Sequence, residues 1–128
     1  MADLLSDLET FLMASNAVGS ATVFRDTIRE TEGMVIALYE YMGTTPIPQI
    51  DGATRAVQVV VRDKSATAAK EKARELYNVL APDDSGIKYL TNERWCLLNI
   101  KQPPFKIKVD EEDRSYYGFN IDITTYTD

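Results

Sequence analysis

The sequence predicts an α+β fold for residues 1–128, with a mainly antiparallel sheet packed against two helices in a single compact domain. Three observations predict it. Two segments carry apolar residues at helical spacing. Several others alternate apolar and polar residues, or are apolar throughout over the length of a strand. The length of 128 residues suits one domain with one hydrophobic core.

The first element along the chain is an amphipathic helix predicted over residues 3–15. Its apolar residues recur at helical spacing and are Leu4, Leu5, Leu8, Phe11 and Leu12. Its opposite face is expected to carry Asp3, Asp7, Glu9 and Thr10. Gly19 follows and ends the helix, and the connector over residues 16–32 is expected to hold at most one short strand, around residues 22–24.

Residues 34–41 form an almost wholly apolar run, which predicts a central strand covered on both faces. Residues 42–54 hold two prolines and two glycines and predict a long exposed loop, because such a segment continues neither a strand nor a helix. Its apolar residues are Pro46, Ile47, Pro48 and Ile50. We expect them to make a subunit or partner contact, or to fold back on the domain's own core.

Residues 55–62 predict a strand, because valines at alternate positions share one face while Ala56, Gln58 and Val60 share the other. A second helix follows, with Ser65 as its N-cap and with Pro82 and Gly86 closing its far end. The face expected to lie on the sheet consists of Ala66, Ala69, Ala73, Leu76, Tyr77 and Leu80.

The rest of the chain predicts strands. Residues 87–90 and 94–101 predict a hairpin, after which Pro103 and Pro104 break the pattern and residues 105–109 lead to an acidic turn. In the last strand, residues 115–126, one face is expected to carry Tyr117, Phe119, Ile121 and Ile123. The other face is expected to carry Tyr116, Gly118, Asn120, Asp122 and Thr124.

The chain lacks the residue types on which most active sites depend. It has no histidine, the commonest general base and metal ligand. Its one cysteine, Cys96, has apolar neighbours and is interpreted as a small buried hydrophobe. No glycine-rich phosphate-binding motif is present. We therefore predict no catalytic residues, no cofactor and no enzymatic activity.

The acidic turn over residues 110–113 is the one cluster that could attract a hard cation. Its adjacent carboxylates cannot all converge on one ion, and the turn lacks the spaced ligands and the glycine of a calcium-binding loop. A solvated turn, and no metal site, is predicted.

The net charge of −6 and the absence of a basic stripe argue against specific nucleic-acid binding, which requires clustered Lys and Arg. No apolar run approaches the roughly 20 residues of a membrane span. The first residues lack the basic segment of a secretory signal. We expect no membrane contact and a cytosolic protein where it is made.

In the order of its elements and in several short sequence segments, the chain resembles the tail terminator, or minor capsid, proteins of long-tailed, siphovirus-type bacteriophages. The resemblance lies in VIALYEYMGTTP, then in the strand, turn and helix of VQVVVRDKSATAAKEKARELYNVL. It continues with IKQPPF, the acidic turn with Arg114, and the closing strand YYGFNIDITTY. It covers roughly residues 34–128, and the preceding part agrees only in kind.

The resemblance implies a structural virion protein at the head-proximal end of the tail, assembled in the host cytoplasm. Several copies, typically six, would form a homo-oligomeric ring that caps the tail tube, ends its polymerisation and joins the head. Its partners would be the tail tube protein and the head-tail connector protein. DNA would pass through without specific binding, because an acidic bore repels phosphates.

Other functions stay open at this point. The chain could be a head-tail adaptor or a tail tube subunit of the same particle. It could also be a monomeric domain that binds a peptide or small molecule through residues 42–54. An enzyme that works through carboxylates alone is the least favoured. Light scattering tests the ring first. A mass near six subunits, or a rise toward it with concentration, supports the ring, and a strict monomer at every concentration favours the adaptor or the binding domain.

Overall fold

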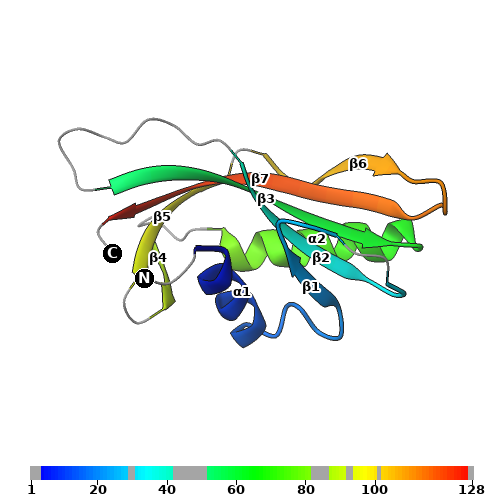
Figure 1. The fold of residues 1–128 in the computed structure, drawn as a ribbon, viewed down its shortest axis with the longest axis horizontal. Helices are drawn as coiled ribbons and strands as arrows, with labels where there is room; N and C mark the ends of the chain where they lie inside the picture. Colours follow the sequence, from blue (N-terminus) through cyan, green and yellow to red (C-terminus); the bar gives the residue numbers. More distant parts are fainter. Residues whose placement is uncertain are drawn as a thin grey trace.

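The computed structural model describes residues 4–28, 31–41, 52–81, 87–91, 94–100 and 102–126. Within them, seven strands form one sheet, and two helices pack on one of its faces (Figure 1). One pair of neighbouring strands is parallel and the other pairs are antiparallel. The predicted α+β fold with a mainly antiparallel sheet is confirmed.

The helices are α1 (Leu4–Ala14) and α2 (Ala66–Leu80). The strands are β1 (Thr22–Arg25), β2 (Val35–Tyr41), β3 (Gly52–Asp63), β4 (Ile87–Thr91), β5 (Arg94–Ile100), β6 (Phe105–Val109) and β7 (Ser115–Tyr126). The short strand expected around residues 22–24 is present as β1, and the predicted hairpin near residues 87–101 is the antiparallel pair β4 and β5.

The sheet is organised around β7. On one side β3 pairs with it along its whole length, from Gly52 opposite Tyr126 to Asp63 opposite Ser115. On its other side β6 pairs with residues 115–118 and β5 with residues 121–125. The sheet continues through β2 and β1 beyond β3, and through β4 beyond β5. In the described chain, no strand pairs with the outer edge of β6.

The main hydrophobic core lies between the sheet and the helices. On the sheet side it contains fully buried residues of β3 and β7, namely Val57, Val59, Val61, Phe119, Ile121 and Ile123. The helices add Leu4, Leu5, Leu8, Leu12, Ala69, Ala73, Leu76 and Leu80. The ring of Tyr77 meets that of Phe119 edge to face at 5.6 Å. The alternation predicted for the third and last strands is confirmed.

Two helical residues were predicted on the wrong side. Asp7, expected on the solvent face, is only 6% exposed, because β1, β2 and β4 all contact α1 and leave it little free surface. Ala66, expected on the sheet, is exposed, because it is the first residue of α2 and the buried face begins at Ala69. Ser65 is the N-cap as predicted, since its hydroxyl accepts a hydrogen bond from the Ala68 N–H at 3.1 Å.

The prediction of a loop over residues 42–54 is wrong at its C-terminal end, because β3 already begins at Gly52. Residues 52–54 carry no strand pattern of their own. They are extended because their backbones pair with residues 124–126 of β7. Long-range pairing therefore lengthens this strand beyond what its side chains indicate.

Candidate interaction site on the open face of the sheet

The face of the sheet turned away from the helices has a smaller apolar cluster, in which Ala37, Val60 and Tyr116 are buried. Beside it lies a pocket of about 560 Å³, which we call the Arg62 pocket. It is lined by Asp26, Thr27, Ile28, Tyr39, Gln58, Val60, Arg62, Ile107, Lys108 and Tyr116. Strands β2, β3, β6 and β7 all contribute to it, together with the segment that follows β1.

Arg62 lies deepest in this pocket, with 1% of its surface exposed. The alternation of β3 directs it away from the helices, on the same face as Gln58 and Val60. Its Nη2 donates to the carbonyl oxygen of Thr31 at 3.2 Å. Within the described residues its Nε has no acceptor. A buried guanidinium normally has its donors satisfied, so the missing acceptor marks a place that a partner could fill.

Two phenol groups, Tyr39 of β2 and Tyr116 of β7, also border the pocket. Burial raises the pKa of the Tyr39 hydroxyl above its usual value of 10.0, and Tyr116 and Asp26 raise it further, against the opposing effect of Arg62. Tyr39 is therefore a neutral hydrogen-bond donor at physiological pH. The Nζ of Lys108 lies 4.8 Å from the centre of the Tyr116 ring, a cation–π contact at the same pocket.

Strand β6 is exposed at all five of its residues. Its large apolar side chains Phe105, Ile107 and Val109 are 36%, 37% and 46% exposed. Its register against β7 shifts between Lys106 and Lys108, and Ile107 and Lys108 both reach the Arg62 pocket. A bulge and lysines hinder uncontrolled pairing at a free edge, while exposed apolar groups favour a specific contact.

Gly118 of β7 lies under β6 and has no room for a side chain. A Cβ there would lie 2.3 Å from the carbonyl oxygen of Val59 and 3.2 Å from Cδ1 of Ile107. The glycine therefore allows Ile107 to pack closely on the sheet beside the pocket.

The acidic turn between β6 and β7 is organised by Asp110. Its carboxylate accepts hydrogen bonds from the N–H groups of Glu112 (2.9 Å) and Arg114 (3.0 Å), from Nε of Arg114 (2.8 Å) and from the hydroxyl of Tyr116 (3.1 Å). Partial removal from water opposes ionisation, but these hydrogen bonds outweigh it and lower the pKa of Asp110 to about 2. The turn predicted between the two strands is present, with residues 111–113 exposed and the partly buried carboxylate of Asp110 ordering it.

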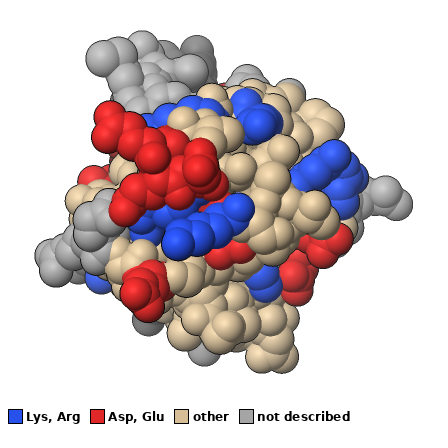
Figure 2. Space-filling view, turned by 90° about the vertical axis from the view of Figure 1, so that its right-hand side faces the viewer, with Lys and Arg blue, Asp and Glu red and all other residues tan. Residues whose placement is uncertain are grey.

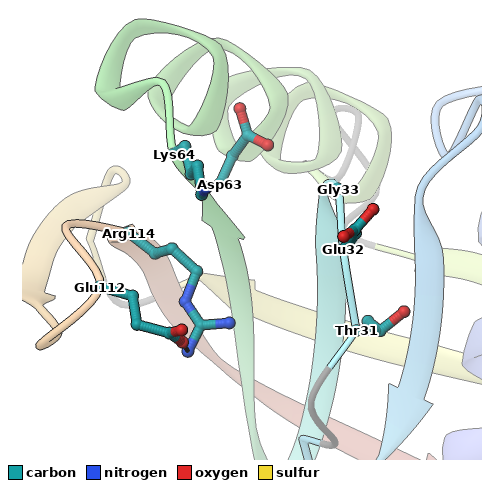
Figure 3. Close-up of a pocket in the computed structure, with 7 residues that line it drawn as sticks. All are labelled: Thr31, Glu32, Gly33, Asp63, Lys64, Glu112 and Arg114. Atoms are coloured by element: carbon teal, nitrogen blue, oxygen red, sulfur yellow. Dashed lines mark ion pairs between the residues drawn. The ribbon is translucent and has the colours of Figure 1, made fainter.

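A second hollow of about 650 Å³ lies at the same end of the molecule. In Figure 3, Glu112 and Arg114 lie on one side of it and Thr31, Glu32 and Gly33 on the other, with the end of β3 between them. The guanidinium of Arg114 is already engaged, with Asp110 and with Glu112 at 2.8 Å. Across the described part of the chain, no group of three His, Cys, Asp or Glu side chains could hold a metal ion.

The contact residues predicted from the sequence, Pro46, Ile47, Pro48 and Ile50, lie outside the described residues. The side chain of Cys96 also lies outside them, although its backbone belongs to β5. The structure therefore tests neither prediction.

Sequence reasoning missed the Arg62 pocket. One signal was available, because the alternation that buries the valines of β3 places Arg62 on the opposite face of a central strand, where a charge is unusual. A second was the alternation of lysines with large apolar residues in FKIKV. Neither signal indicates that the two segments meet, because 42 residues lie between Arg62 and Phe105 in the sequence. They come together in the fold because β7 pairs with both β3 and β6.

A family model described as bacteriophage tail terminator protein matches residues 5–127 of this chain. A comparison with curated proteins found no match. Among the helices of the described residues, none is long and apolar enough to cross a membrane. The family match covers α2, all but the first residue of α1, all the described strands and the Arg62 pocket.

Proposed function

This chain belongs to the bacteriophage tail terminator family, and from that premise we propose that it forms a ring that caps the tail tube, ends its polymerisation and provides the surface to which the head joins. The observation that carries the proposal is the extent of the family match, which runs over residues 5–127. Membership makes the chain a structural protein of a phage tail and of the virion.

The form of the sheet supports assembly. A ring requires two different patches on each subunit, one for each neighbour. The chain offers a free edge with exposed apolar side chains at β6 and a polar pocket on the open face of the sheet. In a monomer, the apolar side chains of β6 stay in contact with water and the buried donor of Arg62 stays unsatisfied, and both are unfavourable. A neighbouring subunit that covers these surfaces removes both costs.

The further details of the proposal follow from the family. We expect a homo-hexamer that contacts the tail tube protein on one side and the head-tail connector protein on the other. Assembly would take place in the host cytoplasm, and the ring would remain at the head-proximal end of the tail. The net charge of −6 supports a bore that repels DNA phosphates, so that the genome slides through.

Residues 42–54 are proposed to contribute a subunit or partner contact through Pro46, Ile47, Pro48 and Ile50. Replacing both Ile47 and Ile50 with Asp would bury unpaired charge in such a contact and weaken it. The monomer should keep its circular dichroism spectrum and melting temperature. An unchanged oligomer mass in this variant would count against the contact.

Two measurements test the ring. Light scattering over a range of protein concentrations should give a mass near six subunits, or a rise toward it. Tail tube protein polymerised in the presence of this chain should give shorter tubes than in its absence, each capped at one end, in electron micrographs. A chain that stays monomeric and leaves tube length unchanged would refute the proposal.

The same experiment separates the alternatives within the particle. A tail tube subunit would be incorporated along the tube and lengthen it. A head-tail adaptor would leave tube length unchanged but bind the connector. A monomeric ligand-binding domain would do none of these.

A further inference from the structure

We propose that the Arg62 pocket receives a carboxylate from a second copy of this chain, and that the acidic β6–β7 turn supplies it. This inference rests on the ring proposed above and names the contact that links neighbouring subunits. It is carried by three features of the described residues: an unsatisfied buried cation, a positive pocket in an acidic chain, and a rigid acidic turn.

The first feature is the state of Arg62. Its guanidinium is 1% exposed, donates to the carbonyl oxygen of Thr31, and has no acceptor for Nε within the described residues. A buried cation with neutral acceptors alone is costly, and a carboxylate is the usual remedy. The planar fork of donors on arginine matches the two oxygens of a carboxylate. Within the described residues, no carboxylate is hydrogen-bonded to Arg62, so its Nε is free to bind an anion from a partner.

The second feature is the charge of the pocket. Its lining includes two cations, Arg62 and Lys108, and one carboxylate, Asp26. The Oδ1 of Asp26 already accepts a hydrogen bond from the Glu40 N–H at 3.2 Å. The neutral hydroxyl of Tyr39 adds a donor. The pocket is thus positive in a chain whose net charge is −6, so an acidic segment of another copy is complementary to it.

The third feature is the turn. In Figure 1 it projects at the end of the β6–β7 hairpin, and Figure 2, which faces this end, shows acidic side chains gathered next to basic ones. Asp110 and Glu112 are engaged within the turn, by the bonds described above and by Arg114. Glu111 is exposed, so its carboxylate is available to a partner. Because Asp110 already orders the turn, little conformational entropy is lost when it binds.

The pocket and the turn adjoin, since Tyr116 lines the pocket and its hydroxyl donates to Asp110, but they offer different groups to a partner, Arg62 and Glu111. In the proposed contact, the turn of one copy enters the pocket of the next, and this heterologous contact can be repeated from one subunit to the next. A ring closes when the rotation between neighbours allows it. The ionic character of the contact also predicts that association weakens as salt is added, because salt screens partly exposed charges.

The test uses charge reversals at exposed positions, which do not disturb the core. Glu111→Lys changes the turn and Lys108→Glu changes the pocket, and each should raise the apparent dissociation constant of self-association about tenfold. The double variant, in which the two charges are exchanged, should recover most of the loss. Analytical ultracentrifugation at low salt measures all three.

Matched controls lie on the outer face of α2. Glu71→Lys and Lys70→Glu make the same charge changes at exposed residues far from the pocket and should leave association unchanged. Equal effects in the controls and in the pocket variants would mean that net charge alone acts, and would overturn the inference.

Arg62→Met offers a second readout. Methionine fills a similar volume without a charge, so the monomer should melt at the same or a higher temperature, because the unsatisfied buried cation is gone. Association should nevertheless weaken about tenfold or more, since the anion loses its partner. A variant that assembles as well as the wild type would overturn the inference.

The outcomes for the inference and for the ring are distinct. If the wild-type chain forms rings and caps tubes, but the Glu111 and Lys108 variants assemble normally, the inference fails and the proposed function stands. If these variants form normal rings but no longer cap tubes, the pocket receives the tail tube protein, and the second copy is the wrong occupant. If the wild type neither self-associates nor caps tubes, the proposed function fails.

Discussion

The two faces of the sheet differ, although the same strands build both. Toward the helices, the central parts of β3 and β7 present large apolar residues, of which Val57, Val59, Val61, Phe119, Ile121 and Ile123 are fully buried. Away from the helices, the alternate residues of the same strands include Gln58, Arg62, Tyr116 and Asn120. The Nε of Arg62 and the Oδ1 of Asn120 are buried there without partners in the described residues.

This difference shows how one chain can satisfy folding and assembly separately. The covered face satisfies itself, because helix and sheet bury each other's apolar residues. The open face combines aromatic, charged and polar groups around a pocket, and it leaves donors and acceptors for a partner. Mutations on the covered face should therefore act on stability, and mutations on the open face mainly on association.

The largest expected effect is on the covered face. Phe119→Ala removes a fully buried ring that packs on Tyr77 and should reduce the free energy of unfolding by about 3–5 kcal/mol. Tyr116→Ala is the matched change on the open face of the same strand, and it should lose about half as much, because one side of that ring borders the pocket. Urea unfolding at concentrations where the chain is monomeric measures both. Equal losses would contradict the distinction between the faces.

A smaller effect is expected where the open face is unusually tight. Gly118→Ala places a Cβ against backbone, 2.3 Å from the Val59 oxygen, so β3 and β7 must shift. We expect a loss of about 1–3 kcal/mol in unfolding free energy. Asn120→Ala, two residues further on the same face, should change stability by less than about 0.5 kcal/mol, since the Oδ1 of Asn120 has no described partner. A neutral Gly118→Ala would show that the strands have room to move apart.

The helix that covers the core should be sensitive at its start. Ser65→Ala removes the N-cap hydrogen bond to the Ala68 N–H and should lower the unfolding free energy by about 1 kcal/mol. Thr67→Ala, at an exposed position in the first turn of α2, is the control and should change it by a few tenths of a kcal/mol. Urea titration of the two variants decides whether the cap stabilises α2.

The smallest effect is expected at the acidic turn and depends on pH. The folded pKa of Asp110 is about 2, below its usual 3.8, so the hydrogen bonds to its carboxylate stabilise the fold above pH 3.8. This contribution is lost as the pH falls from 3.8 toward about 2. Asp110→Asn should remove that part of the acid sensitivity.

The control for the acidic turn is Asp113→Asn. Asp113 has a positive φ of 61°, which asparagine also tolerates. Thermal melts across this pH range should therefore match the wild type for Asp113→Asn and differ only for Asp110→Asn. Identical profiles in both variants would show that Asp110 does not organise the turn.

Much of the covered face could be predicted from residue patterns. The valines of β3, Phe119, Ile121 and Ile123 of β7, and the leucines of α1 all lie where their spacing indicates. The errors at Asp7 and Ala66 have a local cause, since spacing shows which residues share a face but not how far each end of the helix is covered.

The open face could be predicted far less well. The sequence shows that Arg62 and Tyr116 point away from the helices, but not that Ile107 and Lys108 join them, because that depends on β6 pairing with the start of β7 and on its bulge. Residues 52–54 are extended for a similar reason, since they pair with the far end of β7.

The sequence by itself determined the fold class, the two helices and the faces of the long strands. Its short sequence segments also indicated the family to which the chain belongs. Periodicity records which side of an element is buried, and this is a local property of the chain. Only the tertiary structure decided that Arg62, Lys108 and Tyr39 border one pocket, and that β6 keeps a free edge. Contacts between distant segments depend on strand order and register, which no local pattern encodes.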